Sequence, residues 1–217
     1  GGTSASCPAT VMGVMEGLRR LYAASEEARA AGWTASWFSF NTPGGRCEAC
    51  GGSGVQRISL DFLSDVEVVC EDCGGRRYGE EVRRVRVDGL SLDEVLALSV
   101  EDAVRFLDRH ARLIAPLRQL VAVGLGYLCL GQSVSTLSGG ERLRLSLAAD
   151  LAGASAKKGE QRIYLLDEPT RGLHQKDVSS VLALLRALVE QGHTVVVVEH
   201  DPEVWRTADW MVDLGPE

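Results

Sequence analysis

The last third of the chain carries the clearest pattern of hydrophobic and polar positions. Residues 163–166 and 194–198 are short apolar runs, the second nearly all β-branched, and each has the length of a buried strand. Between them, apolar residues recur at helical spacing over 178–189, with Asp177 as the expected N-cap and Gly192 as the stop. A strand, a helix and a strand of these lengths predict a right-handed βαβ unit with two parallel strands.

The pattern over the first 70 residues predicts a less regular structure than that of the last third. Residues 1–13 are rich in small side chains, which is typical of a linker, and residues 16–31 have the apolar spacing of a helix. Four aromatic residues follow within 33–40, and we interpret them as core packing rather than as a platform for stacked bases. Alternation over 58–68 predicts a β-hairpin that turns near 64–65.

Short helices are expected in the middle of the chain. Residues 76–87 are interpreted as strand or extended chain. Ser91 and Ser99 are good N-caps, and each is followed by acidic residues and then by apolar residues at helical spacing. Each is therefore expected to open a short helix, and a further helix is expected after Pro116.

The composition is that of an ordinary globular protein. The chain has 217 residues, of which 45% are hydrophobic and 24% charged, and its formal net charge is −7. These values exclude disorder, collagen and coiled coil as descriptions of the whole chain. No apolar stretch reaches the roughly 20 residues that a membrane span needs, so no membrane partner is expected.

The charge distribution leaves contact with nucleic acid open. The acidic balance argues against a protein that coats nucleic acid by charge alone. Residues 76–86 nevertheless hold five Arg and two Glu, a local charge of +3. The wider segment 44–88 holds seven Arg against nine acidic residues, a net charge of −2. The basic run is therefore either a DNA contact or a solvated strand of alternating charge.

Four of the six cysteines form two Cys-x-x-Cys pairs, each followed by two glycines: Cys47, Cys50, Cys70 and Cys73. Structural zinc prefers four thiolates in a tetrahedron, and two such turns supply them with no open position for water. Disulfides or a redox pair are the alternative, but the duplicated Cys-x-x-Cys-Gly-Gly favours zinc. Zinc-bound thiolates imply a reducing compartment, so the expected location is cytoplasmic. Cys7 and Cys129 are interpreted as small buried or half-buried thiols.

Two carboxylates and a histidine stand where the predicted strands end. The first strand runs into Asp167 and Glu168, and the second into His200. Open α/β sheets present catalytic groups at the carboxyl ends of parallel strands, so these side chains are expected close together. Such an Asp can hold Mg²⁺ through water, the Glu can polarise an attacking water, and the His can reach a γ-phosphate. A strand that merely ends in solvated polar residues is the plainer alternative.

A second candidate phosphate site precedes these strands. Ser138 and Glu141 have the spacing of a capping box, and Gly139 and Gly140 leave the amides of the helix N-terminus uncovered. Free amides and the positive end of a helix favour a phosphate. An ordinary capped helix would show the same residues.

These motifs resemble those of ABC-type ATPases. Leu137-Ser-Gly-Gly-Glu141 is similar to the signature motif, Leu165-Leu-Asp-Glu-Pro-Thr170 to Walker B, and Glu199-His-Asp201 to the switch histidine. More narrowly, the chain resembles the C-terminal half of the UvrA family, the damage-sensing ATPases of bacterial nucleotide excision repair. The stretches that carry this narrower resemblance, besides the motifs above, are 8–10, 38–41, 44–50, 130–133, 170–174 and 213–216.

The resemblance implies a role for each motif residue. The implied cofactor-binding residues are Ser138, Gly139, Gly140, Glu141 and Asp167, and the implied catalytic residues are Glu168 and His200. Asp167 would hold Mg²⁺, Glu168 would act as the base, and the residues of the signature motif would clasp ATP held by another ATPase domain. The implied function is ATP-controlled loading of a homodimer onto damaged double-stranded DNA and hand-off to a downstream repair helicase of the UvrB type.

A few positions depart from the family pattern. Arg171 stands where the family usually has Thr, and Arg142-Leu143-Arg144 replaces a usual Gln-Arg pair. Cys7 and Val11 replace a usual Asn and Tyr. These departures raise an alternative within the same family, a paralogue that protects an antibiotic producer from its own DNA-damaging compound.

One expected motif of such ATPases is missing. A phosphate-cradling Walker A loop needs Gly-Lys-Ser/Thr, and no lysine of this chain follows a glycine. We therefore expect the chain to work with a remaining N-terminal part of the same protein and to turn over negligible ATP alone. The ATPase subunit of a membrane transporter would share the nucleotide motifs but has no reason to carry the cysteine pairs. A non-catalytic, zinc-stabilised module that docks DNA or a partner is a further alternative.

The expected fold class is α/β, an ABC-type ATPase half-domain with a parallel sheet and flanking helices. A zinc-binding α+β signature domain is expected as an insertion. The expected segments are a linker and helix over 1–43, a zinc module with a hairpin over 44–90, a helical signature region over 91–160 and the ATPase core over 161–217.

Overall fold

The computed structural model describes residues 6–60, 63–153, 160–171, 173–213 and 215 of the chain. In chain order the elements are α1 (Pro8–Val11), α2 (Met15–Ala23), α3 (Glu26–Ala30), β1 (Val55–Leu60), β2 (Leu63–Val69), α4 (Glu80–Arg84), α5 (Leu92–Ala97), α6 (Val100–Phe106), α7 (Ala111–Ala122), the 3₁₀ turn η1 (Val134–Thr136), α8 (Gly139–Leu151), β3 (Ile163–Asp167), α9 (Gln175–Glu190), β4 (Thr194–Val198) and α10 (Pro202–Thr207). Within these residues, none of the helices combines the length and the apolar character needed to span a membrane.

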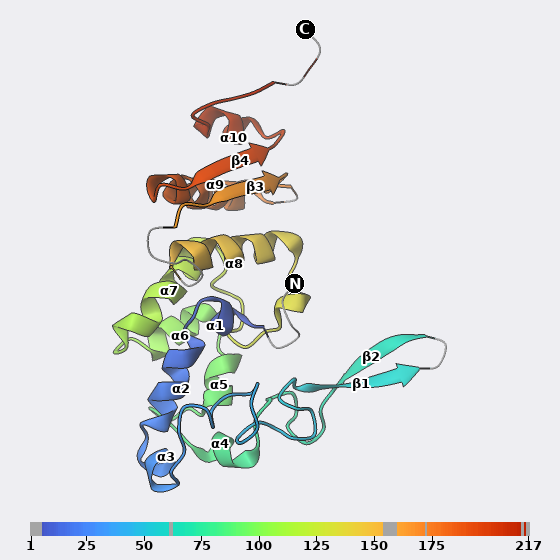
Figure 1. The fold of residues 1–217 in the computed structure, drawn as a ribbon, viewed down its shortest axis with the longest axis vertical. Helices are drawn as coiled ribbons and strands as arrows, with labels where there is room; N and C mark the ends of the chain where they lie inside the picture. The colour runs from blue at the N-terminus through green and yellow to red at the C-terminus, as the bar shows by residue number, and fades with distance from the viewer. Residues whose placement is uncertain (1–5, 61–62, 154–159, 172, 214, 216–217) are drawn as a thin grey trace.

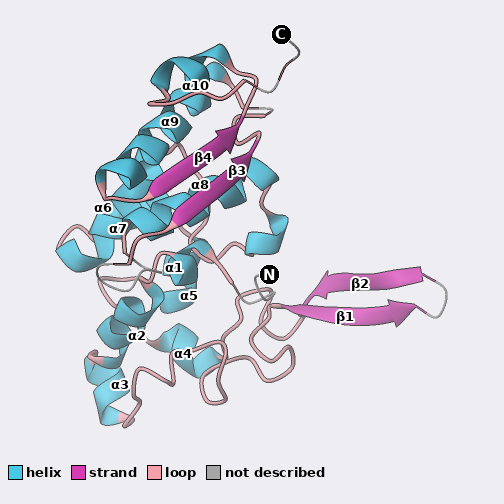
Figure 2. Ribbon diagram, turned by 45° about the horizontal axis from the view of Figure 1, so that its top comes forward, coloured by secondary structure: helices cyan, strands magenta, loops and turns pink. Residues whose placement is uncertain are grey.

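A helical body, a pair of parallel strands and a projecting hairpin make up the molecule. Helices α1–α7 form the body, and α8 lies between this body and the β3–β4 pair (Figure 1). The β1–β2 hairpin extends away from the body as an isolated ribbon (Figures 1 and 2). The strand pair and the hairpin are separate two-stranded sheets.

One contiguous apolar core links the helical body to the strand pair. Leu18 and Tyr22 of α2 are fully buried in it. Phe38 of the loop after α3 is also fully buried, and Phe40 of the same loop is nearly so. The core interpretation of the 33–40 aromatic residues is therefore confirmed for Phe38 and Phe40. The same cluster continues through buried residues of α8 and α9 and reaches the inner face of β3 and β4.

The parallel pair predicted for the end of the chain is present, but it is covered on one face. Strands β3 and β4 run parallel, with Ile163 paired to Thr194 and Asp167 paired to Val198. Tyr164, Leu166, Val195 and Val197 pack against the core. On the opposite face, Ile163 and Leu165 are 71% and 75% exposed, and Val196 and Val198 are also exposed. The prediction that both strands are buried is therefore wrong for this face.

The hairpin is present, and its second strand begins earlier than predicted. Strands β1 and β2 are antiparallel, and Val55 pairs with Val69 and Ile58 with Val66. Strand β2 already begins at Leu63, so the prediction of a turn near 64–65 is wrong. Ile58 and Val66 face solvent, because nothing among the described residues covers that side of the ribbon.

Several helix boundaries differ from the predictions. The helix predicted over 16–31 is two helices, because the Oγ of Ser25 accepts a hydrogen bond from the Ala28 N–H at 3.2 Å and starts α3. Residues 80–84, predicted as extended, form α4, whose first turn is acidic and whose last turn is basic, as the helix dipole favours. Residues 8–11 of the predicted linker form α1.

Two further helices begin earlier than predicted. Helix α7 begins at Ala111 and contains Pro116 rather than starting after it. Helix α9 begins at Gln175, before the predicted cap Asp177, and ends before Gly192, whose φ of +88° terminates it. The predicted caps Ser91 and Ser99 are confirmed for α5 and α6.

Candidate functional site

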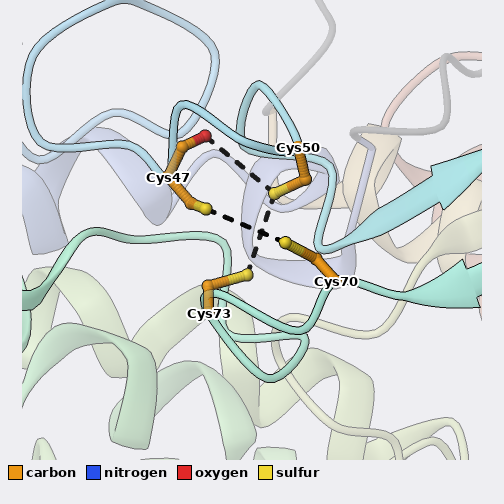
Figure 3. A group of neighbouring side chains, drawn as sticks. All are labelled: Cys47, Cys50, Cys70 and Cys73. Atoms are coloured by element: carbon orange, nitrogen blue, oxygen red, sulfur yellow. Dashed lines mark hydrogen bonds between the residues drawn. The ribbon is translucent and has the colours of Figure 1, made fainter.

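The four paired cysteines meet at the base of the hairpin. Their sulfur atoms all lie within 4.8 Å of one another. Figure 3 shows the four side chains pointing toward one another, with the hairpin strands leaving the cluster. Cys47 Sγ lies 3.9 Å from Cys70 Sγ, and Cys50 Sγ lies 3.7 Å from Cys73 Sγ.

These separations fit a tetrahedral zinc ion and do not fit disulfides. Zn–S bonds of about 2.3 Å place the sulfurs of a regular tetrahedron about 3.8 Å apart. A disulfide would bring two sulfurs to about 2.05 Å. All four thiols are free, and Cys47, Cys70 and Cys73 are buried. The four cysteines could therefore hold one zinc ion in a closed site.

Glycines make the backbone of this site possible. Gly52 has φ +82°, and a Cβ there would lie 1.8 Å from the carbonyl oxygen of Phe40. Gly54 has φ +80°, and its N–H donates to Cys50 Sγ at 3.3 Å. Its carbonyl accepts the N–H of Cys70 at 3.0 Å and so ties the two knuckles together. Backbone conformations that favour glycine therefore bring amide groups to the sulfur of Cys50 and join the two knuckles.

Burial and backbone amides act in opposite directions on these thiols. Burial raises the pKa of Cys47 and of Cys73. Burial also disfavours the Cys50 thiolate, but the N–H groups of Gly54 and Gly52 outweigh it and lower the pKa of Cys50. Of the two lone cysteines, Cys7 is buried as predicted, whereas Cys129 is exposed, so that prediction is wrong.

The two predicted catalytic residues and the predicted cofactor-binding residue Asp167 gather at one end of the parallel pair. Asp167 is the last residue of β3, and the N–H of Glu168 extends the ladder to Val198 O at 2.9 Å. Glu168 has φ +44°, a left-handed conformation that is uncommon outside glycine. His200 follows the end of β4, and its Nε2 lies 3.9 Å from Glu168 Oε1. Parallel pairing thus brings Asp167, Glu168 and His200 to adjacent strand tips.

The carboxylate of Glu199 joins the loop after β3 to the loop after β4. The sequence motifs include this residue but assign it no role. Glu199 Oε1 accepts the N–H of Thr170 at 2.7 Å and also the Thr170 hydroxyl. Glu199 Oε2 accepts the N–H groups of His200 at 2.9 Å and of Asp201 at 3.4 Å. Burial raises the pKa of Glu199, but these hydrogen bonds outweigh it and leave the pKa below its ordinary value.

The signature residues form a separate feature at the start of α8. Ser138 is its N-cap, with Oγ accepting the Glu141 N–H at 3.3 Å, while Glu141 Oε2 accepts the Ser138 N–H at 2.7 Å. The predicted capping box is therefore confirmed. A Cβ on Gly139 would face open space, and one on Gly140 would lie 3.2 Å from Cδ2 of Leu173. The helix N-terminus is thus uncovered at Gly139 and lies beside the loop that follows β3.

The sequence reasoning missed Tyr127 in this feature. Its hydroxyl donates a hydrogen bond to Glu141. This hydrogen bond is the main cause of the lowered pKa of Glu141, and the hydrogen bond from the Ser138 N–H is the second cause. Fourteen positions separate the two residues, so no local spacing points to the contact.

The basic run over 76–86 is not a free patch. Arg76 lies 3.7 Å from Asp93, Arg84 2.5 Å from Glu80 and Arg86 2.8 Å from Glu94. The buried Arg77 stacks over the ring of Phe40, 5.0 Å from its centroid. This arrangement favours the interpretation of neutralised, solvated charges over a dedicated DNA contact.

The comparisons with known proteins agree with this geometry. No protein-family model matches the chain. The chain is 48% identical over 217 residues to UvrABC system protein A of Haemophilus ducreyi. It is 47% identical over 218 residues to UvrABC system protein A of Escherichia coli K12. All of this chain matches, but it spans only 23% of the length of each relative.

A solved structure shows the same fold. UvrA2 from Deinococcus radiodurans matches with a TM-score of 0.87 and 41% sequence identity, over 97% of this chain and 25% of that chain. The whole chain therefore matches one segment of the UvrA proteins. The expected fold class is therefore confirmed for this UvrA-like chain: a mixed α/β fold of the ABC-type UvrA kind, with parallel strands and a four-cysteine cluster.

The division of the UvrA-like chain at residues 43, 90 and 160 stays a prediction. One core cluster of buried residues runs from Cys7 to Leu188 and so crosses all three boundaries. The roles of Ser138, Asp167, Glu168 and His200 likewise stay predictions, although their positions are now known.

Proposed function

We propose that this UvrA-like chain is part of an ATP-hydrolysing protein that binds damaged double-stranded DNA in nucleotide excision repair. The observation that carries the proposal is the convergence of Asp167, Glu168 and His200 at neighbouring strand tips, within a chain that matches UvrA proteins along its whole length. In open α/β sheets, ligands bind at this edge. In this proposal, ATP binding and hydrolysis control how the protein is loaded onto DNA and how the DNA is handed off to a downstream repair helicase.

Each residue at the strand tips has a distinct proposed role. Asp167 is exposed at the end of β3, where its carboxylate is free to hold Mg²⁺ through water. When bound, Mg²⁺ would neutralise part of the negative charge of the phosphates. Glu168 would orient the attacking water and accept its proton, and His200, with its side chain 83% exposed, is free to reach a γ-phosphate.

The start of α8 is proposed to serve a nucleotide held by another domain. Ser138, Gly139 and Gly140, with Glu141 completing the cap, present the helix N-terminus to solvent. A helix N-terminus attracts phosphate through its free amides and its dipole. This feature would therefore clasp ATP bound to the Walker A loop of a second ATPase domain.

The cysteine cluster is proposed to hold structural zinc. The sulfur separations and the amide donors around Cys50 fit a closed tetrahedral site. Zinc there would hold the two glycine-rich knuckles together at the base of the hairpin. A thiolate site of this kind persists in a reducing compartment, which supports a cytoplasmic location.

The exposed face of β3 and β4 supports the proposed partnership with further protein. Parallel sheets are nearly always covered on both faces, yet Ile163 and Leu165 lie open here. We propose that the N-terminal remainder of the same protein covers this face and supplies Walker A. Damaged DNA, a second copy of the full protein and a UvrB-type helicase are the other proposed partners.

Reconstitution tests the proposed ATPase. We expect negligible Mg²⁺-dependent phosphate release from the purified chain, and release that rises at least tenfold when the N-terminal remainder is added. Glu168→Gln should abolish this gain, whereas Glu190→Gln, at the exposed end of α9, should leave it unchanged. Robust ATP turnover by the chain alone would contradict the proposal, as would the absence of turnover after the N-terminal remainder is added.

A second measurement tests the proposed DNA contact. Because four of the five arginines of 76–86 are paired or buried, the chain alone should bind a labelled duplex weakly at 150 mM salt, and the reconstituted protein should bind more tightly. Fluorescence anisotropy measures both. A submicromolar dissociation constant for the chain alone would refute the weak-binding expectation.

A further inference from the structure

We propose that Glu199 is a positioning residue that locks the loop after β3 to the loop after β4 and thereby sets His200 beside Glu168. The proposal rests on the proposed ATPase function, because it assigns to Glu199 an effect on the two groups expected to act on ATP. It concerns a residue that does not itself touch the nucleotide.

The hydrogen bonds of Glu199 divide evenly between the two loops. Oε1 accepts from the backbone and the hydroxyl of Thr170, which is buried and lies three residues beyond the end of β3. Oε2 accepts from the backbone of His200 and of Asp201, in the loop that begins α10. One side chain therefore spans the two loops, 29 residues apart in sequence.

The main chain around Glu199 is held as well. Its carbonyl oxygen accepts the indole N–H of Trp205 at 3.0 Å. Asp201 caps α10 by accepting the Glu203 N–H at 2.8 Å. The backbone on both sides of His200 is therefore fixed, although the imidazole itself is exposed and makes its 3.9 Å approach to Glu168 from this fixed position.

Only a carboxylate fits this set of donors. Four donor groups converge on two oxygen atoms, and each oxygen receives two of them. Glutamine has a single acceptor oxygen, so its NH₂ group would have to face the donors of one loop. Whichever way the amide faces, Glu199→Gln therefore breaks the bridge that holds the two loops to each other, while it preserves size.

A misplaced His200 should slow the chemical step more than it weakens nucleotide binding. A shift of about 1 Å in a positioned group can cost on the order of 100-fold in rate. In the complete UvrA-like protein proposed above, Glu199→Gln should lower kcat for ATP about 10- to 100-fold. KM should change less than about twofold, because Glu199 makes no contact with nucleotide in this scheme.

A double-variant test separates positioning from general structural support. If Glu199 acts through His200, then Glu199→Gln should not lower kcat further in a His200→Ala background. Losses that multiply in the double variant would overturn the proposal, as would a kcat for Glu199→Gln within about twofold of the unchanged protein. Glu190→Gln makes the same change of a carboxylate to an amide at an exposed position and is the control.

Hydrogen–deuterium exchange tests the lock independently of turnover. Glu199→Gln should accelerate amide exchange in both 168–174 and 199–205, whereas acceleration in neither segment or in only one would overturn the lock. If Glu199→Gln does not fold, Thr170→Val removes one donor with little change in volume and should accelerate exchange in the same two segments. A complete protein without ATPase activity would refute the proposed function, while coupled exchange in the two loops would still support the lock.

Discussion

Arg171 holds one oxygen of the Glu168 carboxylate, with Nη1 2.8 Å from Oε2. Arg171 is itself largely exposed, and it stands where the family resemblance expects threonine. The side chain proposed as the catalytic base is therefore paired with a cation at a position where the resemblance predicts an uncharged residue.

Replacing this arginine should raise turnover. Arg171→Thr frees Oε2 of Glu168 to accept a hydrogen bond from water, so we expect kcat of the complete protein to rise about two- to fivefold. An exposed ion pair contributes about 0–1 kcal/mol, so the free energy of unfolding should hardly change. Steady-state ATPase assays and urea titration measure both, with Arg171→Lys as the control that keeps the charge. An unchanged or lower kcat for Arg171→Thr would contradict this expectation.

The cysteine cluster should hold one zinc ion per chain. Cys50→Ser and Cys73→Ser should each abolish stoichiometric zinc in elemental analysis, because each removes one of four ligands. Cys129→Ser, at an exposed lone cysteine, should retain it. Zinc binding releases protons from the thiols, so occupancy should fall as the pH falls. Full zinc content in Cys73→Ser would refute the assignment.

Two buried tyrosines should make stability depend on alkaline pH. Burial raises the pKa of Tyr22 and of Tyr78. The folded state therefore favours the neutral phenols, and their contribution is complete below the ordinary pKa of about 10 and is lost as the pH rises above it. The double variant Tyr22→Phe with Tyr78→Phe should flatten the fall in unfolding free energy between about pH 10 and pH 11.5.

The same variants should weaken the fold at neutral pH. The Tyr22 hydroxyl donates to Leu90 O at 2.8 Å, and the Tyr78 hydroxyl to Phe38 O at 3.0 Å. Loss of each bond should cost about 1 kcal/mol. An alkaline slope that is the same in the double variant as in the unchanged chain would contradict this expectation.

Adjacent leucines in β3 should respond very differently to substitution. Leu165→Thr alters the exposed face and should change the unfolding free energy of the chain by less than about 0.5 kcal/mol. Leu166→Thr alters the covered face and should cost about 2 kcal/mol or more. In the complete protein, the Leu165 variant should also become destabilising, since the proposed remainder covers that face. Urea titration of the unchanged chain, its two variants, the complete protein and the Leu165→Thr variant of the complete protein decides between these outcomes.

The signature serine can be separated from an ordinary cap. Ser138→Ala and Ser99→Ala each remove an N-cap hydroxyl that accepts a backbone N–H, at 3.3 Å and 3.1 Å, and each should cost about 1 kcal/mol. Only Ser138→Ala should also reduce ATPase activity of the complete protein. Equal losses of activity in both variants would leave Ser138 as a structural cap alone.

Much of the local structure followed from local chemistry. The caps at Ser91, Ser99 and Ser138, the β4 boundaries and the four-cysteine cluster were predicted because neighbouring residues supply the hydrogen bonds or ligands that define them. The break at Ser25 was missed, because the apolar spacing continues through it while the side chain caps a new helix.

The sequence by itself determined the four-cysteine cluster, the parallel strand pair and the residues at its tips, since each depends on short spacing or on a period of hydrophobic residues. Only the tertiary structure decided which face of the pair is covered, how Glu199 joins Thr170 to His200, and that Arg171 holds Glu168. The long-range contacts arise from the parallel pairing of β3 and β4, which brings together residues about 30 positions apart. Glu168, which pairs with Arg171 three positions later, has a left-handed backbone that no local pattern of side chains specifies.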